Sequence, residues 1–167
     1  LINISLANEL KKICDIYSVD VKNVIKLSNL HPRVSFLNPG IGIGGHCIPV
    51  DPVFLNQFKN FELIKTSLKI DKEVTATIIK QIKKELKKSK KVLLLGLSYK
   101  ADVDDIRESA AIKILKNIKK NNENINIFDP HFKKFNNINI ETIQKVNFDL
   151  VIILVNHKYF KKIKIKS

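Results

Sequence analysis

The feature that most constrains the fold is a change in hydrophobic periodicity at Lys91. Before it, apolar residues recur every three or four positions over 3–17 and 64–88, which predicts two amphipathic helices, with a shorter helix over 20–28. After it, the run VLLLGLSY (92–99) is almost continuously apolar, as in a strand buried on both faces of a parallel sheet. We therefore expect a helical region over 1–88 and a sheet domain over 89–167.

The second half of the chain predicts strands and helices in alternation. Strands are expected over 92–99, 124–128 and 149–155, and helices over 109–120 and 141–146. This alternation is typical of an α/β fold with a Rossmann-like, doubly wound parallel sheet. Three strands leave an open apolar edge, and the chain begins inside a predicted helix. We therefore expect a truncated sheet domain and a fragment of a longer protein.

Segments that would direct the chain to a membrane are not found in the sequence. No run of 18 or more residues is apolar, and the first residues lack the basic start and small-residue cleavage site of a signal peptide. The two cysteines, Cys14 and Cys47, make a poor disulfide framework. We expect a cytoplasmic protein with reduced cysteines and no membrane partner.

The net charge of +14 by itself favours a nucleic acid or an anionic surface as a partner. However, only Arg33 and Arg107 are arginines, and the lysines are scattered along helical faces without interleaved aromatic residues. Such a distribution is typical of a solvated surface. We therefore expect no nucleic-acid partner.

Glycine and proline are concentrated in one segment. Residues 35–55, SFLNPGIGIGGHCIPVDPVFL, hold four of the five glycines and three of the five prolines, which predicts a loop of specified backbone conformation. Glycines before Cys47 let a substrate approach the backbone and let amide N–H groups face a developing oxyanion. The carboxylate of Asp51 can position a water near the thiolate. For an isolated Gly-Gly-x-Cys, a buried structural cysteine in a tight turn remains the alternative.

Three ordered motifs resemble the UDP-glucose/GDP-mannose dehydrogenase family. Residues 31–55 (HPRVSFLNPGIGIGGHCIPVDPVFL) are similar to the family's active-site loop, and residues 92–109 (VLLLGLSYKADVDDIRES) to its nucleotide-sugar-binding segment. Residues 3–14 (NISLANELKKIC) resemble its central helix. The resemblance extends to about residue 160. It implies an NAD-dependent oxidoreductase, a homodimer, a central helical dimerisation domain over 1–88 and a UDP-sugar-binding domain over 89–167.

For catalysis, the resemblance implies that Cys47 is the nucleophile and Asp51 its partner acid. The family oxidises an alcohol to an aldehyde, then oxidises a thiohemiacetal on the cysteine to a thioester that water cleaves, and two NAD molecules are reduced. A thiolate suits this chemistry because it adds reversibly to an aldehyde and leaves a thioester that water can open.

For binding, the resemblance implies that Tyr99 and Lys100 contact the UDP part of the substrate, where an ammonium is a natural phosphate partner. Arg107 matches a residue that reaches towards the cofactor, and Arg33 matches one that enters the partner subunit's sugar site. Without the motifs, Lys100 would be one more surface lysine and Arg107 part of a solvated turn. The remaining candidate substrate-binding residues precede Cys47 directly: Gly44, Gly45 and His46.

The substrate is narrowed by the residues around Cys47. Gly-Gly-His-Cys resembles the branch of the family that acts on UDP-linked N-acetylhexosamines, and together with His-Pro-Arg it favours UDP-N-acetyl-D-mannosamine, a precursor for surface polysaccharides. Residues 48–50 resemble members that act on UDP-N-acetylglucosamine or UDP-N-acetylgalactosamine. Those sugars and UDP-glucose stay open as alternatives.

The chain also departs from the family pattern. The family's NAD-binding domain carries a glycine-rich fingerprint after a buried strand, whereas GIGIGG here precedes Cys47. We therefore expect NAD to be bound mainly by a domain outside this chain, and the chain alone to be inactive. A non-catalytic UDP-sugar-binding remnant is the alternative from another class. His131 and His157 have no ligand-like spacing with one another or with Cys47, so we expect no metal.

Overall fold

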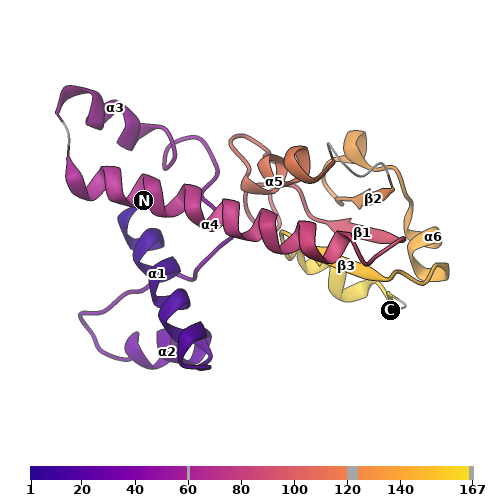
Figure 1. The fold of residues 1–167 in the computed structure, drawn as a ribbon, viewed down its shortest axis with the longest axis horizontal. Coiled ribbons are helices and arrows are strands. Elements are labelled where there is room, and N and C mark those ends of the chain that lie inside the picture. Colours follow the sequence, from indigo (N-terminus) through magenta and orange to yellow (C-terminus); the bar gives the residue numbers. More distant parts are fainter. Residues whose placement is uncertain (60, 120–123, 166–167) are drawn as a thin grey trace.

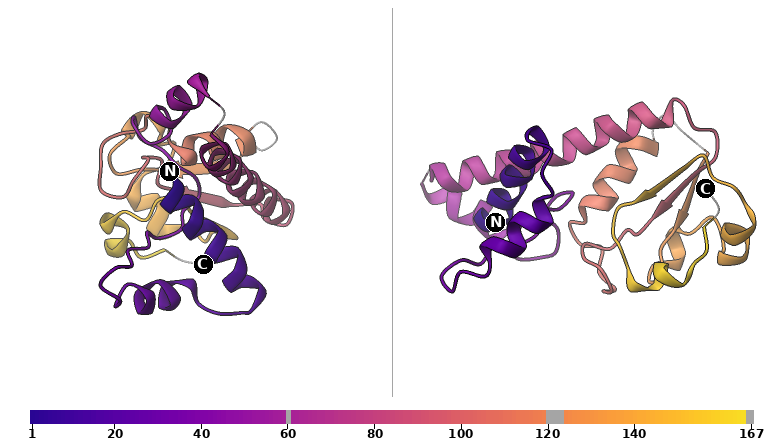
Figure 2. Two further views of the ribbon diagram at one scale, coloured as in Figure 1. Left: turned by 90° about the vertical axis from the view of Figure 1, so that its left-hand side faces the viewer. Right: turned by 90° about the horizontal axis from the view of Figure 1, so that it is seen from below.

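The computed structural model describes residues 1–59, 61–119 and 124–165, and shows an elongated molecule with helices at one end and a sheet at the other (Figure 1). The helices at the first end are α1 (Ile2–Ile16), α2 (Val21–Ser28) and α3 (Asp51–Phe58). The long helix α4 (Glu62–Leu86) begins among them and runs on to the sheet, as the right view in Figure 2 shows. The change in periodicity at Lys91 therefore does mark the passage from helices to a sheet.

The helical end is held together by apolar contacts and by one predicted cap. The side chain of Asp20 accepts a hydrogen bond from the Lys22 backbone N–H at 3.0 Å and so begins α2. Cys14 on α1 packs with Val21 and Ile25 on α2 in a small buried cluster. None of the helices in the described ranges is long and apolar enough to span a membrane.

The sheet has three parallel strands in the order β2-β1-β3. They are β1 (Val92–Leu95), β2 (Ile125–Phe128) and β3 (Leu150–Ile153), and Val92 lies opposite Ile125 on one side and Leu150 on the other. The predicted parallel sheet is thus confirmed, although its first strand is shorter than expected. β1 ends at Leu95 because Gly96 adopts a φ of +83°, where a Cβ atom would collide with the carbonyl oxygen of Val155.

Helices cover both faces of the sheet, which confirms the doubly wound α/β class. Val92 and Leu94 point into a core formed with α4 and α5 (Ala110–Lys119), while Leu93 and Leu95 point into a second core on the opposite face. The second core is closed by α6 (Ile140–Lys145) and by η2 (Lys158–Lys162), a 3-10 helix. A further 3-10 helix, η1 (Lys133–Phe135), lies beside β2.

Candidate active site

The segment before the first predicted catalytic residue is anchored to two helices. We call residues 39–50 the glycine loop. Its Gly40 N–H donates to the Asn8 side chain of α1 at 2.9 Å, and its Ile43 N–H donates to the Asp71 carboxylate of α4 at 2.7 Å. One turn further along α4, the Thr75 hydroxyl donates to the carbonyl oxygen of Ile41 at 3.0 Å. The backbone of this loop is therefore specified by side chains far from it in sequence.

The glycine loop also docks on residues 96–109, the segment that joins β1 to α5. Gly45 N–H donates to the carbonyl oxygen of Arg107 at 2.9 Å. A Cβ atom on Gly44 would lie 2.8 Å from the Tyr99 Cβ, and Gly45, at a φ of +92°, lies directly over the Tyr99 ring. The two glycines are needed here because no side chain fits between the loop and Tyr99. Four of the predicted site residues are thus brought together.

Cys47 is exposed, whereas Cys14 is buried, and both are free thiols. The carbonyl oxygen of Cys47 accepts from the N–H groups of Val50 and Asp51 at 3.1 and 2.9 Å. Cys47 therefore lies one turn before α3, and Asp51 is the first residue of that helix. The prediction of a continuous loop over 35–55 is wrong at this point. Pro52 suits the first turn of a helix, where its missing N–H costs nothing.

Charged groups surround this end of the loop. The Arg107 guanidinium pairs with Asp105, with Nη2 at 2.6 Å from Oδ2 and Nε also donating. The Arg107 bonds, and more weakly the nearby His46, hold the pKa of Asp105 below its ordinary value. Asp105, and to a smaller extent Tyr99 and Cys47, raise the pKa of Arg107. A cationic Arg107 therefore lies within electrostatic reach of Cys47.

Asp71 behaves differently because it is half-buried between the glycine loop and α4. Burial raises the pKa of its carboxyl, although the hydrogen bond from Ile43 and the positive charge of Lys113 act in the opposite direction. Its role is to hold the loop backbone.

A cavity of about 750 Å³ opens between the glycine loop and the carboxyl ends of β1 and β3. The strand order places the topological switch point between these two strands, which is where open α/β sheets bind ligands. Lys100 and Tyr99 line the cavity together with the loop, and Gly44 and Ile48, on either side of Cys47, line it too. The other lining residues come from α1, the loop, α5 and the end of β3: Ile4, residues 37–43, Ser98, Ala101, Ala110, Ala111 and residues 154–156.

Not every predicted residue reaches this cavity. Arg33 is exposed in the turn after α2 and does not line the cavity of its own chain. Gly45, His46, Cys47, Asp51 and Arg107 do not line it either. Cys47 directly precedes the lining residue Ile48, and the Arg107 carbonyl oxygen accepts from the Gly45 N–H next to the lining residue Gly44.

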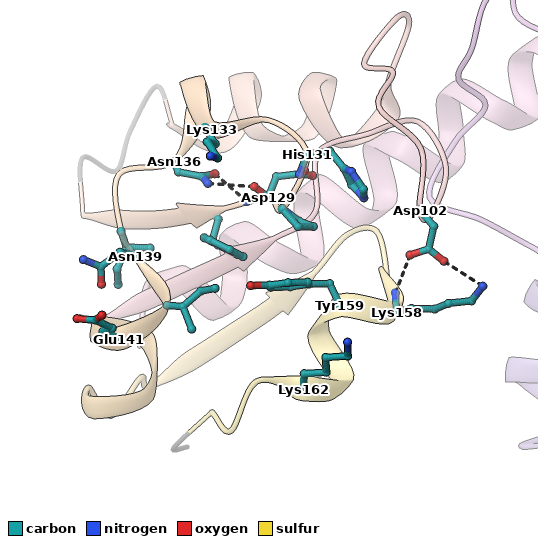
Figure 3. A pocket seen from close by; sticks show the side chains of 14 residues that line it. Asp102, Asp129, His131, Lys133, Asn136, Asn139, Glu141, Lys158, Tyr159 and Lys162 are labelled. Atoms are coloured by element: carbon teal, nitrogen blue, oxygen red, sulfur yellow. Dashed lines mark hydrogen bonds and ion pairs between the residues drawn. The ribbon is translucent and has the colours of Figure 1, made fainter.

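A second cavity, of about 820 Å³, lies at the end of β2 (Figure 3). Residues 98–102 lie between it and the first cavity. Asp102, His131 and the buried His157 each place one potential metal-ligating atom within 4.8 Å of the others. However, His157 Nδ1 already accepts from the Asp102 N–H at 2.9 Å, and the Lys158 ammonium lies 3.7 Å from the Asp102 carboxylate. We assign no metal to this group.

Several side chains that shape the site were not predicted. Asn8, Asp71 and Thr75 hold the glycine loop, and Asp129 and His157 hold the segment that carries Tyr99 and Lys100. One signal was present, because Asp129 and His157 each follow a predicted strand, and the carboxyl ends of parallel strands meet at one edge.

Comparison with known proteins identifies both halves of the chain. The model of the UDP-glucose/GDP-mannose dehydrogenase family, central domain, matches residues 1–82, and the model of that family's UDP binding domain matches residues 93–167. A relative from Methanococcus maripaludis (strain C7), named UDP-N-acetyl-D-mannosamine dehydrogenase, is 38% identical over 170 residues, which cover 98% of this chain and 40% of the relative. A Ralstonia solanacearum relative named NDP-N-acetyl-D-galactosaminuronic acid dehydrogenase is 34% identical, over 97% of this chain and 41% of the relative.

The fold agrees with that of a solved structure. The UDP-D-ManNAc dehydrogenase from Pyrococcus horikoshii superposes with a TM-score of 0.83 at 32% identity, covering 98% of this chain and 40% of that one. The chain thus spans about two-fifths of the length of the relatives it matches.

Proposed function

Because the chain belongs to the UDP-glucose/GDP-mannose dehydrogenase family, we propose that it supplies the nucleophile and the UDP-binding cavity of an NAD-dependent UDP-sugar 6-dehydrogenase. The observation that carries the proposal is the docking of the glycine loop on residues 96–109. The exposed Cys47 directly precedes Ile48, which lines a cavity whose other wall carries Tyr99 and Lys100.

The UDP moiety is assigned to the cavity at the switch point. The ammonium of Lys100 pairs with the pyrophosphate. A charge-assisted contact of this kind is worth about 1.5–3 kcal/mol. The Tyr99 side chain packs against Gly44 and Gly45, so it supports the glycine loop and orients it towards the bound sugar. The sugar end then points to Cys47.

Cys47 carries the covalent chemistry. Its thiolate adds to the aldehyde produced by the first oxidation and gives a thiohemiacetal, which loses a hydride and a proton to become a thioester. Water then opens the thioester, releasing the uronic acid and restoring the thiol. Asp51, in the first turn of α3, takes the proton of that water.

NAD, which the family uses, supplies the hydride acceptor for both oxidations. Within the described residues, we assign one side chain, Arg107, to contact with NAD. The Arg107 side chain is 64% exposed, and Asp105 engages Nε and Nη2, so Nη1 is left for a cofactor phosphate or amide. The segment after β1 is not a tight glycine turn leading into a helix, because it runs from Gly96 to Ser109 before α5 begins. We therefore assign most of the NAD contacts to another domain.

UDP-N-acetyl-D-mannosamine is the proposed substrate. Relatives of that name from Methanococcus maripaludis and Campylobacter jejuni are 38% and 37% identical to this chain, and both alignments include the glycine loop. UDP-N-acetylgalactosamine is the second candidate, favoured by the Ralstonia solanacearum relative named NDP-N-acetyl-D-galactosaminuronic acid dehydrogenase, at 34% identity. UDP-N-acetylglucosamine and UDP-glucose stay open as further alternatives. A cytoplasmic location is proposed because both cysteines are free thiols, and the cytosol keeps thiols reduced.

A homodimer is proposed from two exposed features. Apolar side chains on α1, among them Leu6 and Ile13, are each 52% exposed, and such a surface is suited to an interface. Arg33 lies away from the cavity of its own chain, which is consistent with its entering the sugar site of a partner subunit.

The test uses the two cysteines of the chain itself. Iodoacetamide labelling, read by mass spectrometry, should modify the exposed Cys47 and spare the buried Cys14. UDP-N-acetylmannosamine should slow the labelling of Cys47, whereas GDP-mannose at the same concentration should not. Equal labelling rates with and without the UDP-sugar would contradict the proposal.

A further inference from the structure

His157 is a fully buried side chain in the wall between the two cavities. Its neighbour Asn156 lines the cavity beside the glycine loop, and its neighbour Lys158 lines the second cavity. Both ring nitrogens of His157 have partners. Nδ1 accepts from the Asp102 N–H at 2.9 Å, while Nε2 lies 3.1 Å from the Ser98 hydroxyl and 3.3 Å from the Asp129 carboxylate. Because Nδ1 is an acceptor, the ring proton is on Nε2 and the imidazole is neutral.

Asp129 fixes the position of this imidazole. Its carboxylate is fully buried and accepts from three backbone N–H groups, those of Leu97 at 2.6 Å, His131 at 2.8 Å and Phe132 at 3.2 Å. Asp129 therefore ties the end of β1 to the end of β2 and presents one oxygen to the Nε2–H of His157. Figure 3 shows Asp129 beside His131 at this edge of the sheet.

The network holds both ends of the turn that carries Tyr99 and Lys100. At one end, the Ser98 hydroxyl donates to the Lys100 carbonyl oxygen at 2.8 Å and contacts His157. At the other end, Asp102 adopts a left-handed φ of +61° and donates its N–H to His157. Two residues that face the substrate cavity thus lie between two attachments to one imidazole.

We propose that His157 is a positioning residue, whose neutral form holds residues 98–102 so that Tyr99 and Lys100 face the UDP-sugar. This inference rests on the proposed function, since it assigns a regulating group to the same cavity. The second cavity shares Asp102, Asp129 and His131 with this network, and Lys158, which also lines it, lies beside the Asp102 carboxylate.

The arrangement makes the turn sensitive to acid. A proton on Nδ1 would face the Asp102 N–H, so two donors would oppose each other and the turn would be released. Burial lowers the pKa of His157, and His131 lowers it further, while Asp129 and Asp102 oppose the shift. Lys158 offsets Asp102, with its ammonium 3.7 Å from the carboxylate. The neutral form therefore prevails at neutral pH, and it is lost only below the ordinary histidine pKa of about 6.5.

The experiment measures affinity by isothermal titration calorimetry between pH 8 and pH 5, with this chain and UDP-N-acetylglucosamine as the probe. Each phosphate of this probe carries one ester bond and one anhydride bond, so the probe lacks the second phosphate ionisation near pH ~6. For the unmodified chain, affinity should fall about tenfold as the pH drops below ~6.5. His157→Gln should bind about tenfold more weakly at pH 7.5 and should lose that pH dependence. Lys80→Ala, which changes an exposed residue on α4, should behave as the unmodified chain does.

Two further measurements separate positioning from folding. In the unmodified chain, nitrogen NMR of the imidazole should show His157 protonated on Nε2 alone, and the Asp102 amide should exchange faster with solvent as the pH falls. Ser98→Ala removes the hydroxyl contacts to Lys100 and His157 but leaves the ring in place, so it should weaken binding even where His157→Gln fails to fold.

The outcomes distinguish the two proposals. If the unmodified chain does not bind the probe, or Lys100→Ala binds it equally well, the assignment of the cavity to UDP-sugar is wrong. If Lys100→Ala weakens binding while His157→Gln and Ser98→Ala do not, only the positioning role is wrong. A His157 ring protonated on Nδ1 at pH 7.5 would also overturn it.

Discussion

Replacement of Gly44 by alanine should separate the glycine loop from the wall of the substrate cavity. The new Cβ would lie 2.8 Å from the Tyr99 Cβ, 3.1 Å from the Glu108 carbonyl oxygen and 3.3 Å from the Ser109 Cα, whereas ordinary contact begins at 3.4 Å. Two of these neighbours are backbone atoms and the third is the base of a side chain, so none can rotate away. The loop itself must move.

The size of the effect follows from what that movement breaks. Overpacking by one methyl group costs about 1–3 kcal/mol, and the hydrogen bond from Gly45 N–H to the Arg107 carbonyl, 2.9 Å long, is adjacent to the displaced residue. If the cost falls on docking of the loop, UDP-sugar affinity should decrease by a factor of about 5 to 150, at 1.4 kcal/mol for each factor of ten.

The chain offers a matched control in Gly40, which lies in the same loop. A Cβ on Gly40 meets only the Gly42 carbonyl oxygen, at 3.9 Å. Calorimetric titration with UDP-N-acetylglucosamine should therefore show weak binding for Gly44→Ala and near-normal binding for Gly40→Ala. Equal affinities for the two variants would refute the argument that close approach to Tyr99 builds the site.

Three further outcomes are expected. In a chimera in which this chain replaces the matching region of the Methanococcus maripaludis relative, Cys47→Ser should yield at most one NADH per UDP-sugar, because a serine alkoxide is hard to form near neutral pH; a yield of two at the normal rate would contradict the role of Cys47. Lys100→Ala should weaken UDP-sugar binding by about 1.5–3 kcal/mol in calorimetry, while Lys80→Ala on α4 should not. Asp71 has a raised pKa, so its contribution to stability is greatest below the unfolded pKa of about 3.9 and declines as the pH rises through the folded value. Asp71→Asn keeps an acceptor for Ile43 and should melt at the same temperature as the unmodified chain or higher at pH 7, whereas a lower melting temperature would show that the charge itself is needed.

Much of the fold could be predicted from local patterns. The strand at Val92 was visible because strands buried on both faces of a parallel sheet are continuously apolar, and Asp20 was visible as a cap because its side chain serves its own helix. α3 was missed, since Pro52 after a glycine-rich stretch reads as loop although it also suits the first turn of a helix.

The candidate site was predictable only in part. Cys47 and its glycines lie within one short segment, so their spacing carries information. The contact between Gly44 and Tyr99 depends on how the loop docks on the sheet, and no local pattern encodes it. The same holds for His157 and its partners, which lie 55 and 59 residues away along the chain.

The long helix α4 has a consequence for how this chain can change. Asp71 and Thr75 near its middle hold the glycine loop by hydrogen bonds, and Ile82 and Leu86 near its end pack against the sheet. One inserted residue between Thr75 and Ile82 would rotate the two parts of the helix against each other by about 100° and shift them by about 1.5 Å. The length of α4 thus sets the position of Cys47 relative to the UDP cavity. Insertions within α4 should therefore be tolerated far less than insertions at the surface turn after α2.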